Sequence, residues 1–563
     1  MSLLTESGKK LKPLAVSADR GTFAFEAPEG GLKAGDRIIA QIGGPAKATA
    51  PELTQADKFI VLIKSPRGAK PAAVTLTAST ANRIVGACMI EIVGNRTNRL
   101  MAYTASDAVV GRELSVLVRP EDSHRNVAGE SLGRLIVRLN GTEIEARRVP
   151  IEGSNCCRLE GIALPKPGIY RLEIEDTDSG RKTLTNPIRC AEKERPDKLY
   201  WGLLHGHTEL SDGTGPIDSY YRYMRDECRL DFGAAGDHDH GYETTDAMWK
   251  LNQQAVTRYN EPGRFTAFLG YEWAKWRRNG DGDRNVYYLQ NNRPIYRSDN
   301  DKYPTPPDMF KAIENETAMV IPHHPAETGN FCDWKDHDPE KERLVEIYSV
   351  WGSSERSANQ GNPFPVKGPD RAKLDSGEIP KGFVQKALEL GWRIGFTAGS
   401  DDHTGHPGDL VFSASRPWEY QGGLTGAYAS KNDRESVWKG LWERHCYGTT
   451  GARIIVEFDL NGRPMGSVLP SSEELESARK LRVAVHGMAK IKTIEVVRNN
   501  KEVHTVSPGA LDAEFEWTDK EPLKGINLPP TVHSPESFTF YYLRITQEDG
   551  EMAWVSPVWI LSE

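Results

Sequence analysis

The chain has 563 residues, more than one hydrophobic core usually organises, so several domains are expected. Hydrophobic residues make up 38% of the chain and charged residues 27%, which is ordinary for a soluble protein. No apolar run approaches the roughly 20 residues that cross a bilayer, and the net charge of -8 provides no overall attraction to nucleic acid or anionic lipid. Composition therefore excludes membrane-spanning helices and does not indicate a nucleic-acid partner.

The start of the chain and its cysteines bear on the cellular compartment. The N-terminal residues MSLLTESGKK contain no apolar signal-peptide core. The 7 cysteines are odd in number and form no CxxC pair, a pattern typical of reduced thiols. We therefore expect a cytoplasmic protein, although an export signal removed before this N-terminus would not be visible.

Residues 1–195 are predicted to be β-rich. From Arg112 to Ile188, short alternating runs such as LSVLV, RLIVRL and YRLEIE are separated by turns at NG, PG and SG. This rhythm is typical of an immunoglobulin-like sandwich. Residues 1 to about 105 are less regular, and they either share a sheet with the sandwich or form a small domain of their own. The polar stretch 191–200 marks the expected boundary to the next domain.

Residues 196–452 are predicted to alternate strands with helices. The expected strands are 199–204, 232–235, 265–269, 285–289, 319–321, 344–348 and 394–398. The expected helices begin at Pro216, Thr244, Pro307 and Phe383. Such alternation predicts a parallel sheet, and ligands at the carboxyl ends of many strands predict a distorted seven-stranded (β/α) barrel. A segment rich in Gly, Pro, Ser and Lys at 352–382 is interpreted as an insertion, either a pocket wall or a surface excursion.

Residues 453–563 return to a strand pattern, with runs such as IIVEFDLNG, LRVAVHG and FTFYYLRITQEDG. These runs predict a second, C-terminal β-sandwich-like domain. The fold class predicted for the whole chain is therefore multidomain α/β plus β, with the barrel flanked by sandwich-like domains.

Histidines and acidic residues cluster at or just beyond the expected strands of the middle domain. In HGH at 205–207, residues two apart in extended backbone point to the same side, so His205 and His207 can bind one ion together. The other clusters are GDHDH at 236–240, GYE at 270–272, PHHP at 322–325, VEIY at 345–348 and GSDDH at 399–403. Each alone has an ordinary explanation as an exposed acid, a rigid turn or a helix N-cap. Taken together in this order, they predict one polynuclear metal site.

The order HxH, SDG, DH, GxE, HP, an acid within a strand, and SDxH resembles the polymerase and histidinol phosphatase (PHP) family over roughly residues 198–452. The resemblance implies the seven-stranded barrel and two or three divalent ions, Mn or Zn, with Fe a further option. The chain is also similar to a larger branch of PHP-like proteins with β-rich flanks. The motifs behind this second resemblance are GYEW at 270–273, RNVYY at 284–288, VWGSSE at 350–355, GSDDHTGHPG at 399–408, CYGTTG at 446–451 and AWVSPVW at 553–559.

The resemblance also implies which residues hold each ion. The first ion would be held by His205, His207 and Asp401, with Glu272 bridging to the second. The second ion would be held by Glu346 and His324, although the neighbouring His323 is the alternative ligand. The third ion would be held by Asp212, His238 and His403. Asp212 and Glu346 stand where many members use histidine, and these oxygens favour Mn over Zn.

The predicted activity is hydrolysis of a small phosphomonoester or phosphodiester by a metal-activated hydroxide. Asp237 or His240 would protonate the leaving oxygen, beside the bridging Glu272. Phosphate would be bound by cations beyond the metals, and the candidates are Lys275, Arg277, Arg278, Arg284 and Arg356. Arg284 and Arg356 are favoured, because they adjoin the family-like segments RNVYY and GSSE. Any of these cations has the alternative of being a solvated surface charge.

Two other functions follow from the same sequence. A metal-activated hydroxide also hydrolyses amides and lactones, so a carboxyl derivative is the alternative substrate. The other alternative is a binding or scaffold protein that uses its β domains. For the enzyme we expect a small-molecule phosphate ester as partner and no membrane partner, while the oligomeric state is not predicted.

Overall fold

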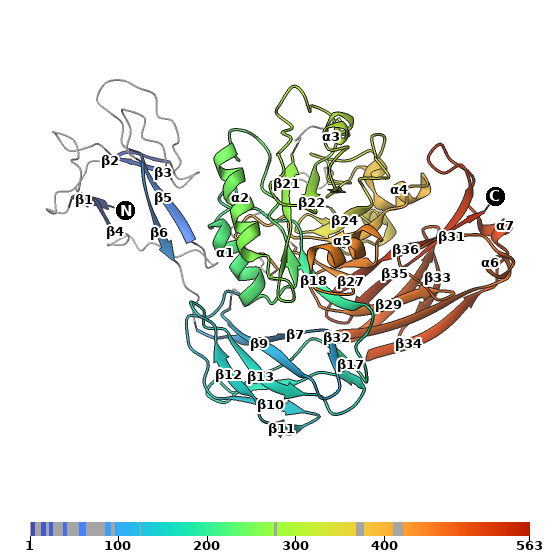
Figure 1. The fold of residues 1–563 in the computed structure, drawn as a ribbon, viewed down its shortest axis with the longest axis horizontal. Helices are drawn as coiled ribbons and strands as arrows, with labels where there is room; N and C mark the ends of the chain where they lie inside the picture. Colours follow the sequence, from blue (N-terminus) through green and yellow to red (C-terminus); the bar gives the residue numbers. More distant parts are fainter. Residues whose placement is uncertain are drawn as a thin grey trace. The chain divides into compact units, whose positions relative to one another are not determined.

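The computed structural model describes backbone and side chains of residues 96–562, except 124, 275–278, 367–376 and 409–419. The chain divides into two compact units, Met1–Ile92 and Val93–Glu563 (Figure 1). In the first unit three antiparallel strand pairs are described, β1 with β4, β2 with β3, and β5 with β6. Their bounds are β1 Ser2–Thr5, β2 Pro13–Ser17, β3 Thr22–Phe25, β4 Ile38–Gln41, β5 Ala56–Leu62 and β6 Val85–Glu91.

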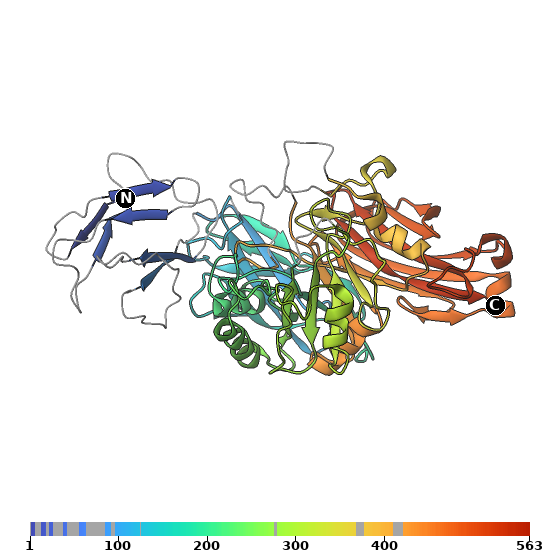
Figure 2. The same cartoon turned by 90° about the horizontal axis from the view of Figure 1, so that it is seen from above.

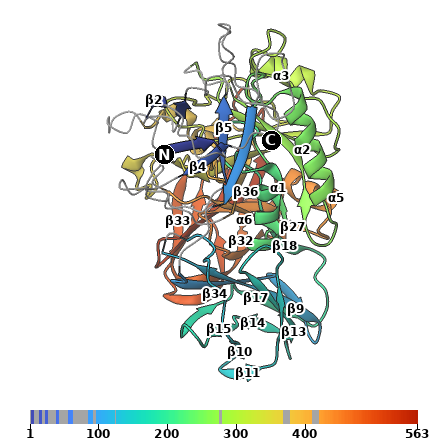
Figure 3. The ribbon, with the colours of Figure 1, turned by 90° about the vertical axis from the view of Figure 1, so that its left-hand side faces the viewer.

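The second unit begins with strands that share one hydrophobic core. Two four-stranded sheets, in the orders β11-β10-β15-β16 and β12-β13-β9-β7, accompany a three-stranded sheet, β14-β17-β8 (Figure 3). Alternate residues of β7 are buried, as expected for a strand with one face on a core. The bounds are β7 Arg99–Thr104, β8 Asp107–Val109, β9 Glu113–Glu121, β10 Leu135–Leu139, β11 Thr142–Ile144, β12 Arg147–Pro150, β13 Cys157–Ala163, β14 Gly168–Tyr170, β15 Glu173–Asp176, β16 Arg181–Leu184 and β17 Ile188–Ala191.

The middle region contains strands and short helices where the sequence predicts them. Its strands are β18 Lys198–Leu203, β19 Phe232–Gly233, β20 Thr266–Ala267, β21 Leu269–Trp273, β22 Arg284–Tyr288, β23 Ala318–Pro322, β24 Leu344–Ser349, β25 Gly352–Ser353, β26 Gly395–Ala398, β27 Leu424–Ala429 and β28 Cys446–Thr449. Its helices are α1 Ile217–Arg222, α2 Asp246–Tyr259, α3 Pro306–Ala312, α4 Val384–Glu389 and α5 Arg434–Trp442. The Thr245 side chain caps α2 by accepting a hydrogen bond from Met248 N.

The prediction of a seven-stranded (β/α) barrel is wrong. The chain is mostly β-sheet, with 42% strand, 14% helix and only seven helices in the described part. The strands of the middle region fall into three separate sheets, in which β21-β22-β23 is wholly antiparallel and β24 pairs with β26 in parallel. The error arose because alternating apolar runs and helices indicate elements but not their partners, so antiparallel pairs were read as parallel ones.

The C-terminal strands continue a sheet that begins in the middle region. A 13-stranded sheet passes from β20 through β18, β27 and β28 to β36 and on to the other C-terminal strands, because β28 and β36 pair antiparallel. The long C-terminal strands of this sheet are the orange and red arrows in Figure 2. The remaining bounds are β29 Ile455–Leu460, β30 Arg463–Pro464, β31 Val468–Pro470, α6 Glu473–Ser477, β32 Arg479–Arg498, β33 Lys501–Val506, β34 Ala510–Asp519, α7 Leu523–Ile526, β35 Ser537–Gln547 and β36 Met552–Ser562.

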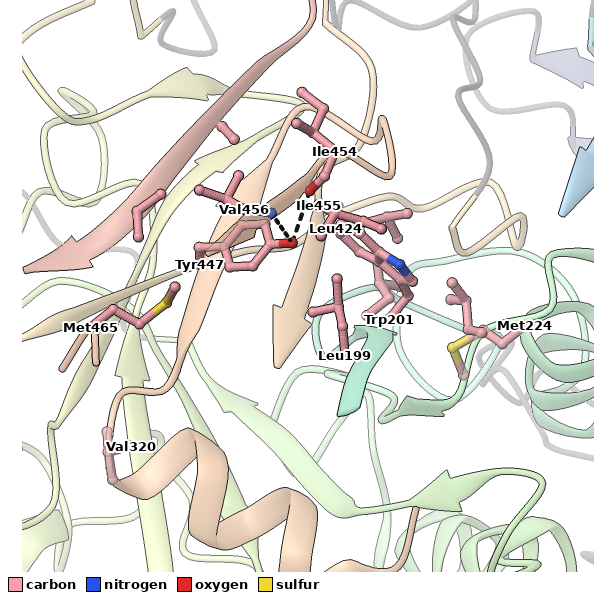
Figure 4. Packing of buried hydrophobic residues seen from close by; sticks show 14 of the residues in the cluster. Leu199, Trp201, Met224, Val320, Leu424, Tyr447, Ile454, Ile455, Val456 and Met465 are labelled. Atoms are coloured by element: carbon pink, nitrogen blue, oxygen red, sulfur yellow. Dashed lines mark hydrogen bonds between the residues drawn. The ribbon is translucent and has the colours of Figure 1, made fainter. Parts of the chain in front are cut away.

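Aromatic residues pack where the middle strands meet the C-terminal ones (Figure 4). Tyr447, in β28, lies edge-on to Trp201 of β18, with ring centroids 5.8 Å apart. Its buried hydroxyl donates a hydrogen bond to Ile454 O at 2.8 Å and accepts one from Val456 N. The core therefore continues from the strand that precedes HGH into the C-terminal part of the sheet.

A buried ion pair joins the predicted insertion to the C-terminal strands. Glu355 accepts hydrogen bonds from Arg544 Nη2 at 2.6 Å and from the Tyr542 hydroxyl at 2.7 Å. Trp554 Nε1 donates a further bond at 2.9 Å, so both carboxylate oxygens are used. This anchors the chain directly after β25, while residues 367–376 of the insertion lie outside the described residues.

Among the described residues there is neither a candidate membrane-spanning helix nor a disulfide bond. No helix among them is both long enough and apolar enough to cross a membrane. The cysteine side chains that the structure describes are all free thiols, and all are buried.

Breaking the buried pair should cost far more stability than breaking an exposed one. We expect Arg544→Met to lower the free energy of unfolding by about 3–5 kcal/mol, because the Glu355 charge would be left buried beside fewer partners. Arg482, 58% exposed and paired with Glu516, provides the matched control, and Arg482→Met should cost less than about 1 kcal/mol. Urea titration of both variants measures the difference, and equal losses would contradict it.

Candidate metal centre

Four overlapping groups of histidines and acids lie together in the middle region. In each group the potential ligand atoms all lie within 4.8 Å of one another. The groups are His205-His207-Glu272-Asp401, His205-His323-Glu346, His323-His324-Asp401 and His207-Asp212-His238-His403. All ten residues predicted as metal ligands from the sequence are in these groups. Because the groups share members, the sites they define are adjacent.

The HGH motif follows β18 and supplies two buried imidazoles. His205 Nε2 lies 3.2 Å from Glu272 Oε2, and His205 Nδ1 lies 3.1 Å from Glu346 Oε1. His207 Nε2 lies 3.0 Å from Asp401 Oδ1 and 3.3 Å from Glu272 Oε2. The two histidines therefore face the same carboxylates, as the extended spacing predicts.

Glu272 occupies the centre of the cluster. It lies on β21, is 2% exposed, and its Oε2 faces both histidines of HGH. Its other oxygen, Oε1, lies 3.4 Å from His323 Nε2. A carboxylate with one oxygen toward each of two imidazole sets can bridge two cations.

The histidine pair of PHHP is buried against the same acids. Neither ring nitrogen of His323 makes a well-formed hydrogen bond to the described residues: Nε2 lies 3.4 Å from Glu272 Oε1 and Nδ1 lies 3.8 Å from Asp401 Oδ2. His324 Nε2 lies 3.6 Å from Asp401 Oδ2. Buried imidazole nitrogens that lack good hydrogen bonds are costly unless another group satisfies them, so this donor set fits divalent cations. The structure places both histidines at the cluster and leaves the choice between them open.

The backbone brings the ligand loops together. Isolated parallel bridges link His238, beyond β19, to Glu272 of β21, and His323, directly after β23, to Glu346 of β24. Two ligands, His324 and Asp401, have positive φ of 31° and 52°, a strained region that is rare for residues with side chains. Gly399 is required beside them, because a Cβ at this position would collide with the Glu346 carboxylate.

The fourth group forms the open side of the cluster. Asp212 Oδ1 lies 3.1 Å from His403 Nε2 and 3.4 Å from His238 Nδ1. The Asp212 side chain is 50% exposed, whereas the histidines of this group are buried. The His207 and His403 rings stack at 3.9 Å between centroids. Solvent therefore reaches the cluster at Asp212.

Asp237 and His240, the predicted proton donors, differ in their contacts. Asp237 accepts hydrogen bonds of 2.8 Å from Thr208 N, Thr208 Oγ1 and Ser211 Oγ, which hold the turn after HGH. His240 Nδ1 lies 3.1 Å from Glu243 Oε2, and its ring stacks on the exposed Tyr242. Burial lowers the pKa of His240, but the Glu243 hydrogen bond and the Asp239 charge outweigh it and raise the pKa above its usual value.

Sequence reasoning missed Glu243, which supports the loop that carries the ligand His238. Its Oε2 also lies 3.2 Å from His238 Nδ1, so one carboxylate orients both His238 and His240. The pKa of Glu243 falls to about 2: burial opposes this shift, and the two histidines outweigh the burial. Its position three residues after His240 was the available signal, but an acid there is also ordinary at a turn.

The two described arginines that were predicted to bind phosphate, Arg284 and Arg356, are each paired with an acid outside the cluster. Arg284 is 1% exposed and donates to Glu342 Oε1 at 2.5 Å and to Gly282 O. It neighbours Asn285 on β22 and so points to the opposite face from Glu272. Arg356 pairs with Glu502 of β33 at 2.8 Å. These contacts give no support to substrate binding by either arginine, and Lys275, Arg277 and Arg278 lie outside the described residues.

Comparison with other proteins identifies the family but no activity. The model of a protein family of unknown function, DUF3604, matches residues 219–358 and 409–462. An uncharacterized protein of Chlamydia pneumoniae is 32% identical over 477 residues, covering 84% of this chain and 75% of its own. Uncharacterized proteins of Chlamydia muridarum and Chlamydia trachomatis are each 34% identical over 478 residues, with the same coverage. The chain belongs to the family of these chlamydial proteins.

Cation binding at this cluster should release protons. The carboxylates Asp401 and Glu346 raise the pKa of His205 to about 10 against the effect of burial, and the pKa of His207 lies well above its usual value. Both rings therefore hold a proton more tightly than a free imidazole does, whereas cation binding requires neutral imidazole. We expect affinity for Mn²⁺ to fall as the pH is lowered from about 8 to about 6.

Titration calorimetry in two buffers of different ionisation enthalpy measures this release. The difference in observed heat, divided by the difference in ionisation enthalpy of the two buffers, gives the number of protons released. We expect at least about one proton per bound ion. His504→Gln, on β33 away from the cluster, is the control and should leave the release unchanged. A heat that is independent of the buffer would show that the histidines are neutral before the cation binds.

Proposed function

We propose that the protein is a metal-dependent hydrolase and that its substrate is a small phosphomonoester or phosphodiester. The observation that carries this proposal is the overlap of the four ligand groups through His205, His207, His323 and Asp401. Groups that share ligands would hold cations side by side, which is the arrangement used for in-line phosphoryl displacement. The order of motifs, which resembles the PHP family, supports the same activity.

The donor set favours two or three hard divalent ions. Glu272, Asp401 and Glu346 contribute buried carboxylates next to imidazoles, a mixture that suits Mn or Zn, with Fe also compatible. His205, His207 and Asp401 would hold one ion and His323 or His324 with Glu346 a second, while the group at Asp212 would hold a third. When bound, these ions supply an activated water and neutralise charge on a phosphoryl oxygen.

The residues of the chain would then orient the substrate and move a proton. The substrate would enter at Asp212, where the cluster meets solvent. His240 would donate the proton to the leaving oxygen, because its raised pKa keeps it charged nearer neutral pH and it lies beside the ligand His238. Asp237 would act as a positioning residue, since its oxygens hold the turn after HGH.

One observation supports a second candidate substrate. Arg284 and Arg356, the two arginines favoured for phosphate recognition, are both engaged with other acids. An amide or a lactone carries no charge at the reacting group and needs no such cations. The same cluster would hydrolyse it with the same activated water, so carboxyl derivatives belong in the first substrate panel.

The proposed activity is tested with the Mn-loaded protein on a panel of phosphomonoesters, phosphodiesters, amides and lactones. We expect phosphate release that chelation abolishes and that Asp401→Asn reduces by at least about 10³-fold, because Asp401 belongs to two ligand groups. Asp178→Asn, an exposed acid of the β15–β16 turn, is the matched control and should keep full activity. Turnover of amides or lactones alone would replace the phosphoesterase proposal with the second candidate.

The role of His240 is tested by the dependence of the rate on the leaving group. We expect His240→Gln to slow hydrolysis of an alkyl phosphate by about 10²-fold or more, because an alkoxide needs a proton as it leaves. Hydrolysis of the p-nitrophenyl ester should change little, since that leaving group is stable without a proton. Equal loss with both substrates would assign His240 a structural role through Glu243.

A further inference from the structure

Asn285 is a buried amide for which neither the fold nor the predicted ligand set provides a role. It lies at the second position of β22, the central strand of β21-β22-β23. Its side chain is fully buried, and neither Oδ1 nor Nδ2 has a hydrogen-bond partner among the described residues. A buried amide without partners destabilises a fold, so its presence calls for a group that binds there.

The strand register directs this amide toward the metal centre. Asn285 pairs directly with Glu272 across the antiparallel β21–β22 ladder. Side chains of directly paired residues lie on the same face of a sheet, so Asn285 shares the face of the central carboxylate. Tyr287, two residues further along the same face, donates a hydrogen bond of 2.6 Å to Leu204 O, directly before His205.

A glycine on the neighbouring loop shows how close the amide lies to a ligand. A Cβ added to Gly236 would lie 2.8 Å from Asn285 Oδ1 and 3.0 Å from His205 Cδ2. The amide oxygen and the edge of the His205 ring therefore border the same small space. Only glycine leaves this space open, and Gly236 is fixed there by a hydrogen bond from its N to Gly206 O.

We propose that Asn285 is a positioning residue of the metal centre, whose amide hydrogen-bonds the oxygen ligands that surround the ions when these are bound. The inference rests on the proposed metal-dependent function. An amide suits the task because it is neutral and offers both a donor and an acceptor. Partners of this kind orient ligands around an ion, and their loss typically weakens metal binding by about 10–100-fold.

The proposal predicts opposite effects of one substitution on metal affinity and on stability. Asn285→Leu removes the amide while keeping a similar volume. The metal-free variant should melt at the same temperature as the wild type or higher, because an unpaired buried polar group is lost. Its affinity for Mn²⁺, measured by titration calorimetry, should fall by about 10–100-fold, and the rise in melting temperature on adding Mn²⁺ should shrink.

Asn362→Leu is the matched control, because Asn362 is a buried asparagine whose amide is satisfied by Ser353 O and Arg356 O. This control should melt at a lower temperature than the wild type and bind Mn²⁺ unchanged. If Asn285→Leu does not fold, Asn285→Ala is measured in the same way. The two variants thus separate an amide that serves the metal centre from one that serves the fold.

The outcomes distinguish this inference from the function on which it rests. A wild-type protein that binds no Mn²⁺, Zn²⁺ or Fe²⁺ would overturn the proposed metal centre itself. A wild type that binds Mn²⁺ tightly, with Asn285→Leu equal to it, would overturn the role of Asn285 alone. A metal-free Asn285→Leu that melts well below the wild type and keeps its affinity would show that the amide only supports packing through a buried water.

Discussion

The packing of buried carboxylates against buried imidazoles is the constraint on which this part of the molecule depends. Glu272 and Asp401 remain charged although burial opposes it, because neighbouring histidines hold the pKa of each carboxyl well below its usual value. Neither partner set is stable alone in a dry interior. Without cations, protonated histidines balance the buried carboxylates. Cations would balance the same carboxylates and would also satisfy the ring nitrogens of His323, so the arrangement suits metal binding.

Strands and the loops that follow them bring the ligands together at this cluster. The ligands lie on or after six strands, β18, β19, β21, β23, β24 and β26, and positive φ angles at His324 and Asp401 mark backbone strain there. The buried pair of Glu355 and Arg544 ties the predicted insertion to the C-terminal strands. The sheets and the buried ion pair thus hold ligand loops whose strained backbone would be unfavourable without them.

Much of the candidate site could be predicted because short sequence motifs mark its residues. HGH, PHHP and GSDDH lie at strand ends that short apolar runs indicate, and the structure gathers these clusters at one place. Glu243 and Asn285 could not be found in this way. A single acid after a turn and a single amide in a strand have many ordinary explanations, and only the contacts with His238 and the register with Glu272 single them out.

The sequence by itself indicated most strands and helices of the middle region, though not β27, β28 or α5, and the side chains expected to bind metal, because periodicity and residue type are local properties. Tertiary structure alone decided how those strands pair, and it replaced the expected barrel with three sheets, one of which continues into the C-terminal strands. It also decided which charges face the cluster. Arg284 and Asn285 are adjacent in sequence, yet the alternation of a strand sends the arginine to Glu342 and the amide toward His205.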